Sequence, residues 1–146
     1  MRKKLTNNTL NITNYGKIPP QNIELEAIIL GAMLLDRSCI PTVVSILKSD
    51  SFYLNSHLLI FNAICQLFEN QKPIDSATLV QALRAEGNLE AVGGAFFITS
   101  LTDRIASSAN TEYHCRIIEQ EAIKRRLIYL SNNILQKCYD NTEDPF

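Results

Sequence analysis

The stretch from Asn110 to Tyr139, NTEYHCRIIEQEAIKRRLIYLSNNILQKCY, decides the fold, because it carries one helical pattern of about eight turns. A polar link follows, and Asp144-Pro145-Phe146 then gives a helix start signal, since Asp is a preferred N-cap and Pro suits the first helical position. A long helix, a short link and a new helix make a helical hairpin. The sequence therefore predicts a first arm at 109–140 and a truncated link to a missing second arm at 141–146, in a piece of a longer protein.

Apolar residues occupy two sides of this predicted helix. The broader face holds Tyr113, Ile117, Ile123, Leu127, Ile128, Leu130, Ile134, Leu135 and Cys138, and a second cluster holds Cys115, Ile118, Ala122 and Tyr129. A helix that is apolar on two sides has to bury both. We expect one face to pack on its own domain and the other to contact the missing hairpin partner or another subunit. We predict that the second cluster is the exposed subunit contact, or that part of the broader face is exposed instead.

Residues 19–108 contain the helix start and stop signals of a compact helical head. Residues 1–18 lack apolar periodicity and are predicted to form a flexible tail. Asn22 and Asp75 are placed to cap helices. The run from Ala27 to Leu35 is apolar almost all round, so this helix should be the buried centre of the domain.

Further helix signals complete the head. Asn55 or Ser56 is expected to cap a helix, and Gly87 suits a left-handed helix end. The apolar face of the helix after Asn55 is predicted to comprise Leu58, Phe61, Cys65 and Phe68. Apolar and polar residues nowhere alternate long enough for a strand. The predicted fold is therefore all-α, a compact bundle of about six helices that ends in the long helix.

Composition describes one domain of ordinary size. The 146 residues are 46% hydrophobic and carry a formal net charge of -1, so the chain can bury a core and has no domain-wide basic surface for nucleic acid. No apolar run approaches the roughly 20 residues of a membrane span. The basic N-terminus also lacks the apolar core of a signal peptide, so we expect a cytoplasmic protein.

No constellation for catalysis or metal binding is evident in the sequence. The four cysteines form no C-x-x-C pair, and His57 and His114 are too far apart for a helical metal pair, so both are interpreted as surface or capping residues. No phosphate-binding glycine motif occurs. We therefore expect no catalytic residue, metal or cofactor in this chain, which by elimination predicts a binding and assembly module.

A series of short motifs adds a family resemblance. In order they are Pro19-Pro20-Gln21-Asn22-Ile23-Glu24, Glu26, Leu30-Gly31-Ala32, Leu35-Asp36, Phe52-Tyr53, His57, Ile60-Phe61, Ala63-Ile64, Pro73-Ile74-Asp75, Thr78-Leu79, Leu83, Gly87, Leu89, Val92-Gly93-Gly94, Leu101, Ala109-Asn110, Glu112-Tyr113 and Arg125-Arg126-Leu127-Ile128. Their joint order resembles the N-terminal domain of the bacterial replicative DNA helicase, the DnaB family. Leu25 and Phe97 depart from that pattern by apolar exchanges that leave the fold unchanged.

The resemblance implies a role within a larger parent protein. There this domain would form the collar of a hexameric ring through paired subunits and would dock the C-terminal domain of primase, with a helicase loader as a further partner. ATP and Mg²⁺ would bind only in a C-terminal RecA-like motor, which would also be the route to DNA. The chain itself would not be an enzyme.

Three residues are predicted to form the docking surface for the primase, namely Phe97, Ile128 and Ile134. The alternative is that all three belong to the core, because apolar residues at helical spacing are usually buried. Two rival functions also stay open: a free-standing all-α adaptor or loader-like interaction module, and a helical DNA-binding module. A phosphate-binding motif encoded downstream would exclude the adaptor, and weak, salt-independent behaviour in a DNA titration would exclude the DNA-binding module.

Overall fold

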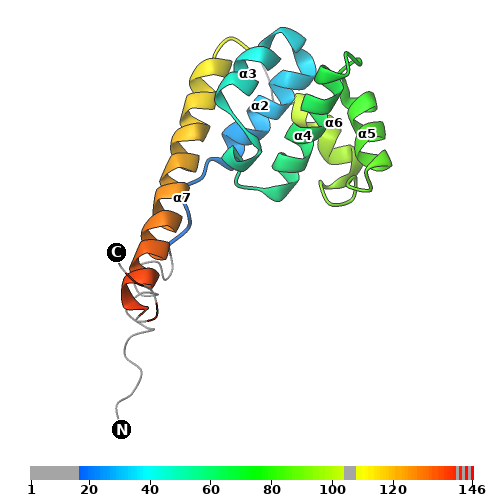
Figure 1. Ribbon diagram of the computed structural model, residues 1–146. Coiled ribbons are helices and arrows are strands. Elements are labelled where there is room, and N and C mark those ends of the chain that lie inside the picture. The colour runs from blue at the N-terminus through cyan, green and yellow to red at the C-terminus, as the bar shows by residue number, and fades with distance from the viewer. Residues whose placement is uncertain (1–16, 104–107, 141, 143, 145) are drawn as a thin grey trace. The chain divides into compact units, whose positions relative to one another are not determined.

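The computed structural model describes residues 17–103, 108–140, 142, 144 and 146. The described residues contain six α-helices, two short 3₁₀ helices and no strand, which confirms the all-α prediction (Figure 1). The elements are α2 (Ile23–Leu35), η1 (Arg37–Cys39), α3 (Ile40–Ile46), η2 (Ser49–Ser51), α4 (Asn55–Glu69), α5 (Ser76–Ala85), α6 (Gly94–Asp103) and α7 (Thr111–Tyr139).

The chain divides into two units. One comprises residues 21–123, hereafter the head, and the other comprises residues 124–146 together with the chain up to Pro20. The first half of α7 therefore belongs to the head and its second half to the other unit. The predicted tail at 1–18 lies almost entirely outside the described residues, and the predicted domain boundaries stay predictions.

Helix α2 is the centre of the head, as its composition predicts. Asn22 caps it, because the Asn22 side chain accepts a hydrogen bond from the backbone N–H of Leu25 at 3.1 Å. From Glu26 on, nearly every side chain of α2 is buried. Helices α4 and α6 pack against α2, and α5 packs against both α4 and α6 (Figure 1).

Helix α4 departs from the prediction in its start and its buried face. Leu54 is the N-cap and makes no side-chain capping bond, so the cap predicted at Asn55 or Ser56 is wrong. Of the predicted face only Phe61 is fully buried, and the buried residues are His57, Ile60, Phe61, Ala63, Ile64 and Leu67. The reason is that α4 packs against both α2 and α5, which cover adjacent faces of the helix.

The first half of α7 packs on the head through a narrow seam. Its buried residues are Thr111, Cys115, Ile118 and Ala122, which recur at four and three residues along one face. The expectation that Cys115, Ile118 and Ala122 are exposed is therefore wrong, because these small and medium side chains fill the core of their own head. The hydroxyl of Ser51 in η2 also donates to the Glu119 carboxylate at 2.6 Å and ties this half of α7 to the head.

No described helix is by itself long and apolar enough to cross a bilayer. Only the sharply bent pair of α2 with Arg37–Ile46 passes that test, by length and composition alone, and the two parts meet at 117°.

Candidate functional site

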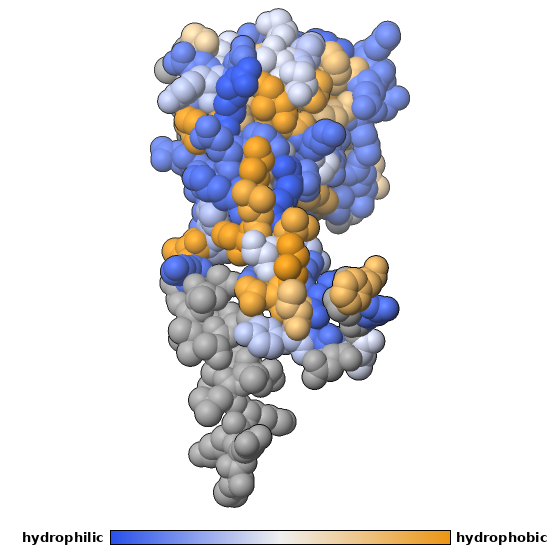
Figure 2. Space-filling model, turned by 60° about the vertical axis from the view of Figure 1, so that its left-hand side comes forward, coloured by the Kyte–Doolittle hydropathy of each residue, from blue (hydrophilic) through white to orange (hydrophobic). Residues whose placement is uncertain are grey.

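The second half of α7 carries an exposed apolar surface. Ile123, Leu127, Leu130 and Ile134, hereafter the α7 stripe, recur at four, three and four residues and so lie on one face of the helix. Leu127 is 58% exposed and Ile134 is 56% exposed. Figure 2 shows apolar side chains gathered along this helix. Large apolar side chains at this spacing are typical of a helix that packs against a second helix.

Ile128 lies outside the α7 stripe, at the other edge of the broader apolar face. It is six residues from Ile134, which places the two side chains about 120° apart around the helix. Both are exposed, so the alternative that they belong to the core finds no support in the structure. Tyr129 is the one residue of the predicted subunit cluster that is exposed, at 68%.

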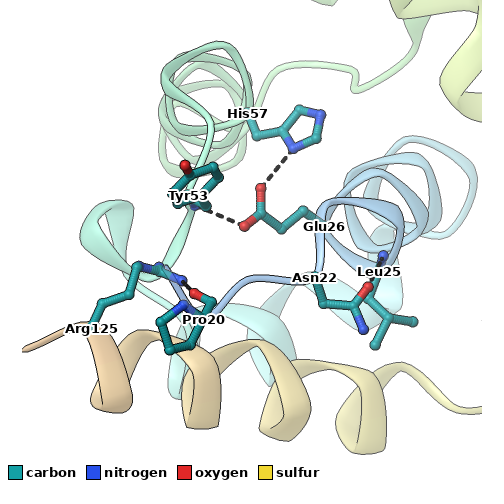
Figure 3. Close-up of polar contacts among 7 residues, drawn as sticks. All are labelled: Pro20, Asn22, Leu25, Glu26, Tyr53, His57 and Arg125. Atoms are coloured by element: carbon teal, nitrogen blue, oxygen red, sulfur yellow. Dashed lines mark hydrogen bonds and ion pairs between the residues drawn. The ribbon is translucent and has the colours of Figure 1, made fainter. Parts of the chain in front are cut away.

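The start of the second unit is fixed by a polar contact. The guanidinium of Arg125 donates from Nη1 to the backbone carbonyl oxygen of Pro20 at 2.8 Å (Figure 3). Near the end of the chain, the Asp144 carboxylate accepts from the backbone N–H of Phe146 at 2.9 Å. This is the bond that an N-cap residue makes to the second residue of a helix. The predicted second arm itself would lie beyond residue 146 and stays a prediction.

Phe97 lies in the head, in the wall of a surface cavity of about 700 Å³. Other residues that line the cavity include Ile23, Leu54, His57, Val92 and Gly93. Phe97 is half-buried and packs against the core. Gly93 and Gly94 have φ angles of 102° and 77°, in the left-handed region that glycine tolerates, and they form the turn into α6.

A buried pair of Glu26 and His57 lies beside this cavity. Each residue is 1% exposed, and the Glu26 Oε2 atom lies 2.7 Å from the His57 Nδ1 atom (Figure 3). The second carboxylate oxygen, Oε1, accepts from the backbone N–H of Tyr53 at 2.7 Å. The interpretation of His57 as a surface or capping residue is therefore wrong. Glu26 lies within α2, among buried residues that are otherwise apolar. This position was the one sequence signal that Glu26 itself is buried.

The thiols of the head are unsuited to nucleophilic chemistry. Burial raises the pKa of Cys65 to about 11 and that of Cys115 to about 12, and burial together with the Asp36 charge also raises the pKa of Cys39. A reactive cysteine needs a lowered pKa and access to solvent. Within the described part of the chain, no group of His, Cys, Asp and Glu side chains could hold a metal ion.

The described residues thus form an all-α head and a long helix with an exposed apolar face. The family model for the DnaB-like helicase N-terminal domain matches residues 18–120, which is most of the chain. The chain belongs to this family.

Relatives and solved structures agree with this assignment. The chain is 41% identical over 131 residues to the replicative DNA helicase DnaB of Rhodothermus marinus, covering 90% of the chain and 14% of that protein. It is 35% identical over 128 residues to DnaB of Geobacillus stearothermophilus, covering 88% of the chain and 28% of that protein. The chain thus spans 14% and 28% of the lengths of these two relatives.

The fold is shared with solved N-terminal domains. That of DnaB helicase from Mycobacterium tuberculosis superposes with a TM-score of 0.82 at 30% identity, covering 86% of the chain and 91% of that domain. That of Helicobacter pylori DnaB, reported with its interactions with primase, gives a TM-score of 0.67 at 24% identity, covering 80% and 90%. The second likeness concerns the fold alone.

Proposed function

We propose that this chain is the assembly and docking domain of a hexameric replicative DNA helicase, and that it pairs helicase subunits and binds the C-terminal domain of primase. The observation that carries the proposal is the α7 stripe, an exposed apolar face of the helix. The family supports the same role, because its members are the N-terminal domains of DnaB-like helicases.

The proposed occupant of the α7 stripe is a second helix in the assembled helicase. The spacing of Ile123, Leu127, Leu130 and Ile134 matches the seam of a two-helix contact, in which each side chain inserts between residues of the facing helix. Burying a fully exposed side chain of this size contributes about 1.5–3 kcal/mol. The stripe residues are about half exposed, so each would contribute about half of that, which favours a helical partner. Of the predicted subunit cluster, only Tyr129 is exposed, and at 100° per residue it lies about 120° around α7 from Ile123, outside the α7 stripe.

The proposed docking surface for primase comprises Phe97 in the head and Ile128 and Ile134 on α7. Phe97 offers an aromatic ring beside a cavity, and the two isoleucines are exposed aliphatic side chains. Aromatic and branched residues are typical anchors of protein interfaces. Ile134 also belongs to the α7 stripe, so its substitution distinguishes the two contacts.

The remaining functions would belong to the parent helicase. ATP and Mg²⁺ would act in its motor domain, DNA would be bound and unwound there, and a helicase loader would be a further partner. The protein would work in the cytoplasm, at the replication fork.

The docking proposal is tested in the complete helicase with a matched control. The change Phe97→Ala or Ile128→Ala should weaken binding of the primase C-terminal domain by about 2 kcal/mol or more, which is about 30-fold. The control is Phe96→Ala, since Phe96 precedes Phe97 on α6 and is 87% exposed. Affinity is measured by titration calorimetry, and thermal unfolding is measured for each variant.

The outcomes separate the possible roles. Unchanged affinity with a lowered melting temperature would assign Phe97 to the core alone and would contradict its docking role. The change Ile134→Ala should lower primase affinity if primase covers that side chain, and it should instead reduce helicase assembly if a second helix covers it. A helicase that assembles and binds primase normally with all three substitutions would contradict the proposal.

A further inference from the structure

The Glu26–His57 pair is unusual because it places two ionisable groups in an otherwise apolar core. Both side chains are almost fully buried, and the carboxylate accepts from the Tyr53 N–H as well as contacting His57. A buried ion pair is weak evidence for stability, since well-packed hydrophobic residues of similar volume often serve as well or better. The contacts of the pair with neighbouring residues therefore indicate its role better than its effect on stability does.

The contact on the other side of His57 is Phe97. The two rings are stacked, with their centroids 6.0 Å apart and their planes inclined by 11°. Both residues line the cavity described above. His57 therefore lies between two groups: the buried carboxylate of Glu26 and the Phe97 ring in the cavity wall. The three residues come from three helices, Glu26 from α2, His57 from α4 and Phe97 from α6.

The Phe97 side chain is also confined from the direction of the Gly93–Gly94 turn. A Cβ atom placed on Gly93 would lie 3.1 Å from the Phe97 Cβ atom, so Gly93 leaves room that any other residue would fill. The ring of Phe97 is thus set by its stacking on His57 and by its close approach to Gly93.

We propose that Glu26 and His57 are positioning residues that hold the Phe97 ring in its binding orientation, so that partner affinity at the cavity depends on two side chains that are almost inaccessible to a partner. The His57 Nδ1 atom and the Glu26 Oε2 atom lie 2.7 Å apart, at hydrogen-bond distance, and this bond fixes the orientation of the imidazole. The imidazole in turn fixes the plane of Phe97. This inference rests on the proposed role of Phe97 in docking primase.

Two conservative substitutions break this linkage at different points. His57→Asn places an amide N–H near the position of Nδ1, so the bond to Glu26 can persist while the stacked ring is removed. Glu26→Gln keeps the shape of the side chain but replaces the carboxylate group that contacts Nδ1 by an amide. The matched control is Ser51→Ala, which removes the hydrogen bond from Ser51 to Glu119 and the one that Ser51 accepts from the Lys48 backbone N–H.

The test combines a spectroscopic signature with affinity. The NMR signals of ¹³C-labelled Phe97 are recorded in this chain, and binding of the primase C-terminal domain is measured in the complete helicase. We expect His57→Asn and Glu26→Gln to shift the Phe97 signals and to weaken binding about tenfold, which corresponds to about 1.4 kcal/mol. Ser51→Ala should lower the melting temperature without either effect.

A second route moves Phe97 without altering the pair, which keeps the test valid if one variant does not fold. Gly93→Ala adds a methyl group against Phe97, whereas Gly94→Ala adds one in open space at a comparable positive φ. Gly93→Ala should weaken primase binding more than Gly94→Ala does.

The results distinguish this inference from the proposed function. If Phe97→Ala weakens binding while His57→Asn and Glu26→Gln behave as Ser51→Ala does, the positioning role is overturned and the docking role stands. If Phe97→Ala binds primase as the unchanged protein does, the docking role fails, and the inference fails with it.

Discussion

Truncation of Glu26 to Ala should be among the most destabilising single changes on α2. It removes the acceptor of the hydrogen bond from the Tyr53 backbone N–H and the partner of the His57 ring, and both contacts are 2.7 Å long. It also leaves a cavity and a buried imidazole without its partner. Breaking a buried pair by removing one member costs about 3–5 kcal/mol, because the remaining group stays buried and uncompensated.

The expected loss is large enough for a simple thermal assay. At about 2–4 °C per kcal/mol for a domain of this size, the melting temperature should fall by about 6–20 °C. The control is Glu24→Ala, which removes an exposed carboxylate from the same first turn of α2 and so shares any loss of favourable interaction with the helix dipole. Urea unfolding of both variants gives the difference in free energy of unfolding directly.

The reasoning would be refuted if Glu26→Ala lost no more than about 0.5 kcal/mol beyond Glu24→Ala, since surface substitutions fall within that range. The double change Glu26→Leu with His57→Leu tests whether the loss of stability comes from leaving one group unpaired or from losing the pair itself. It should recover much of the lost stability, because the penalty comes from the unpaired group and not from the absence of a charge pair.

Three further predictions concern the thiols, acid stability and nucleotide. In the native protein a thiol reagent should modify the exposed Cys138 first, whereas Cys39 and Cys115 should react only on unfolding; equal rates would contradict their burial and raised pKa values. Hydrogen bonds from Thr78 lower the pKa of Asp75. The stabilising contribution of Asp75 is therefore present above about pH 4 and is lost as the pH falls through the lowered pKa. Asp75→Asn should make the stability depend less on pH in this range, and an unchanged acid unfolding curve would contradict the assignment. Millimolar ATP should leave the melting temperature of this chain unchanged, whereas a ligand at 100 times its dissociation constant would add about 2.7 kcal/mol.

Local signals explain which parts of the fold the sequence could predict. The caps at Asn22 and Asp75 and the left-handed glycine at Gly87 depend on residues within one turn of each other, and the structure confirms all three. The burial of α2 was predictable for a similar reason, because a helix that is apolar all round has no other place in a globular domain.

Choices that depend on packing between distant segments could not be predicted. Helix α7 has apolar residues on two sides, and the shape of the head alone decides that the seam with Cys115 and Ile118 is buried. Glu26 and His57 are 31 residues apart, and nothing local to either residue indicates that α2 and α4 bring them together. The docking surface depends on a partner that the sequence does not contain, so it stays a prediction.

The most direct test of the central claim is the mass of this chain in solution as a function of concentration. The claim is that the α7 stripe accepts a second helix. Light scattering should show a mass near 16.5 kDa at low concentration that rises toward twice that value at high concentration, as α7 stripes of two molecules pair. Leu127→Glu should hold the chain at the lower mass without changing its melting temperature, because Leu127 is exposed.

The matched control is Gln136→Glu. Gln136 is exposed and lies nine residues from Leu127, about 180° around α7. Its change to Glu therefore adds the same negative charge on the opposite side of the helix. The account predicts that Gln136→Glu pairs as the unchanged protein does and that Leu127→Glu does not. Equal masses for Leu127→Glu and the unchanged chain at every concentration, or a stable hexamer at micromolar concentration, would contradict it.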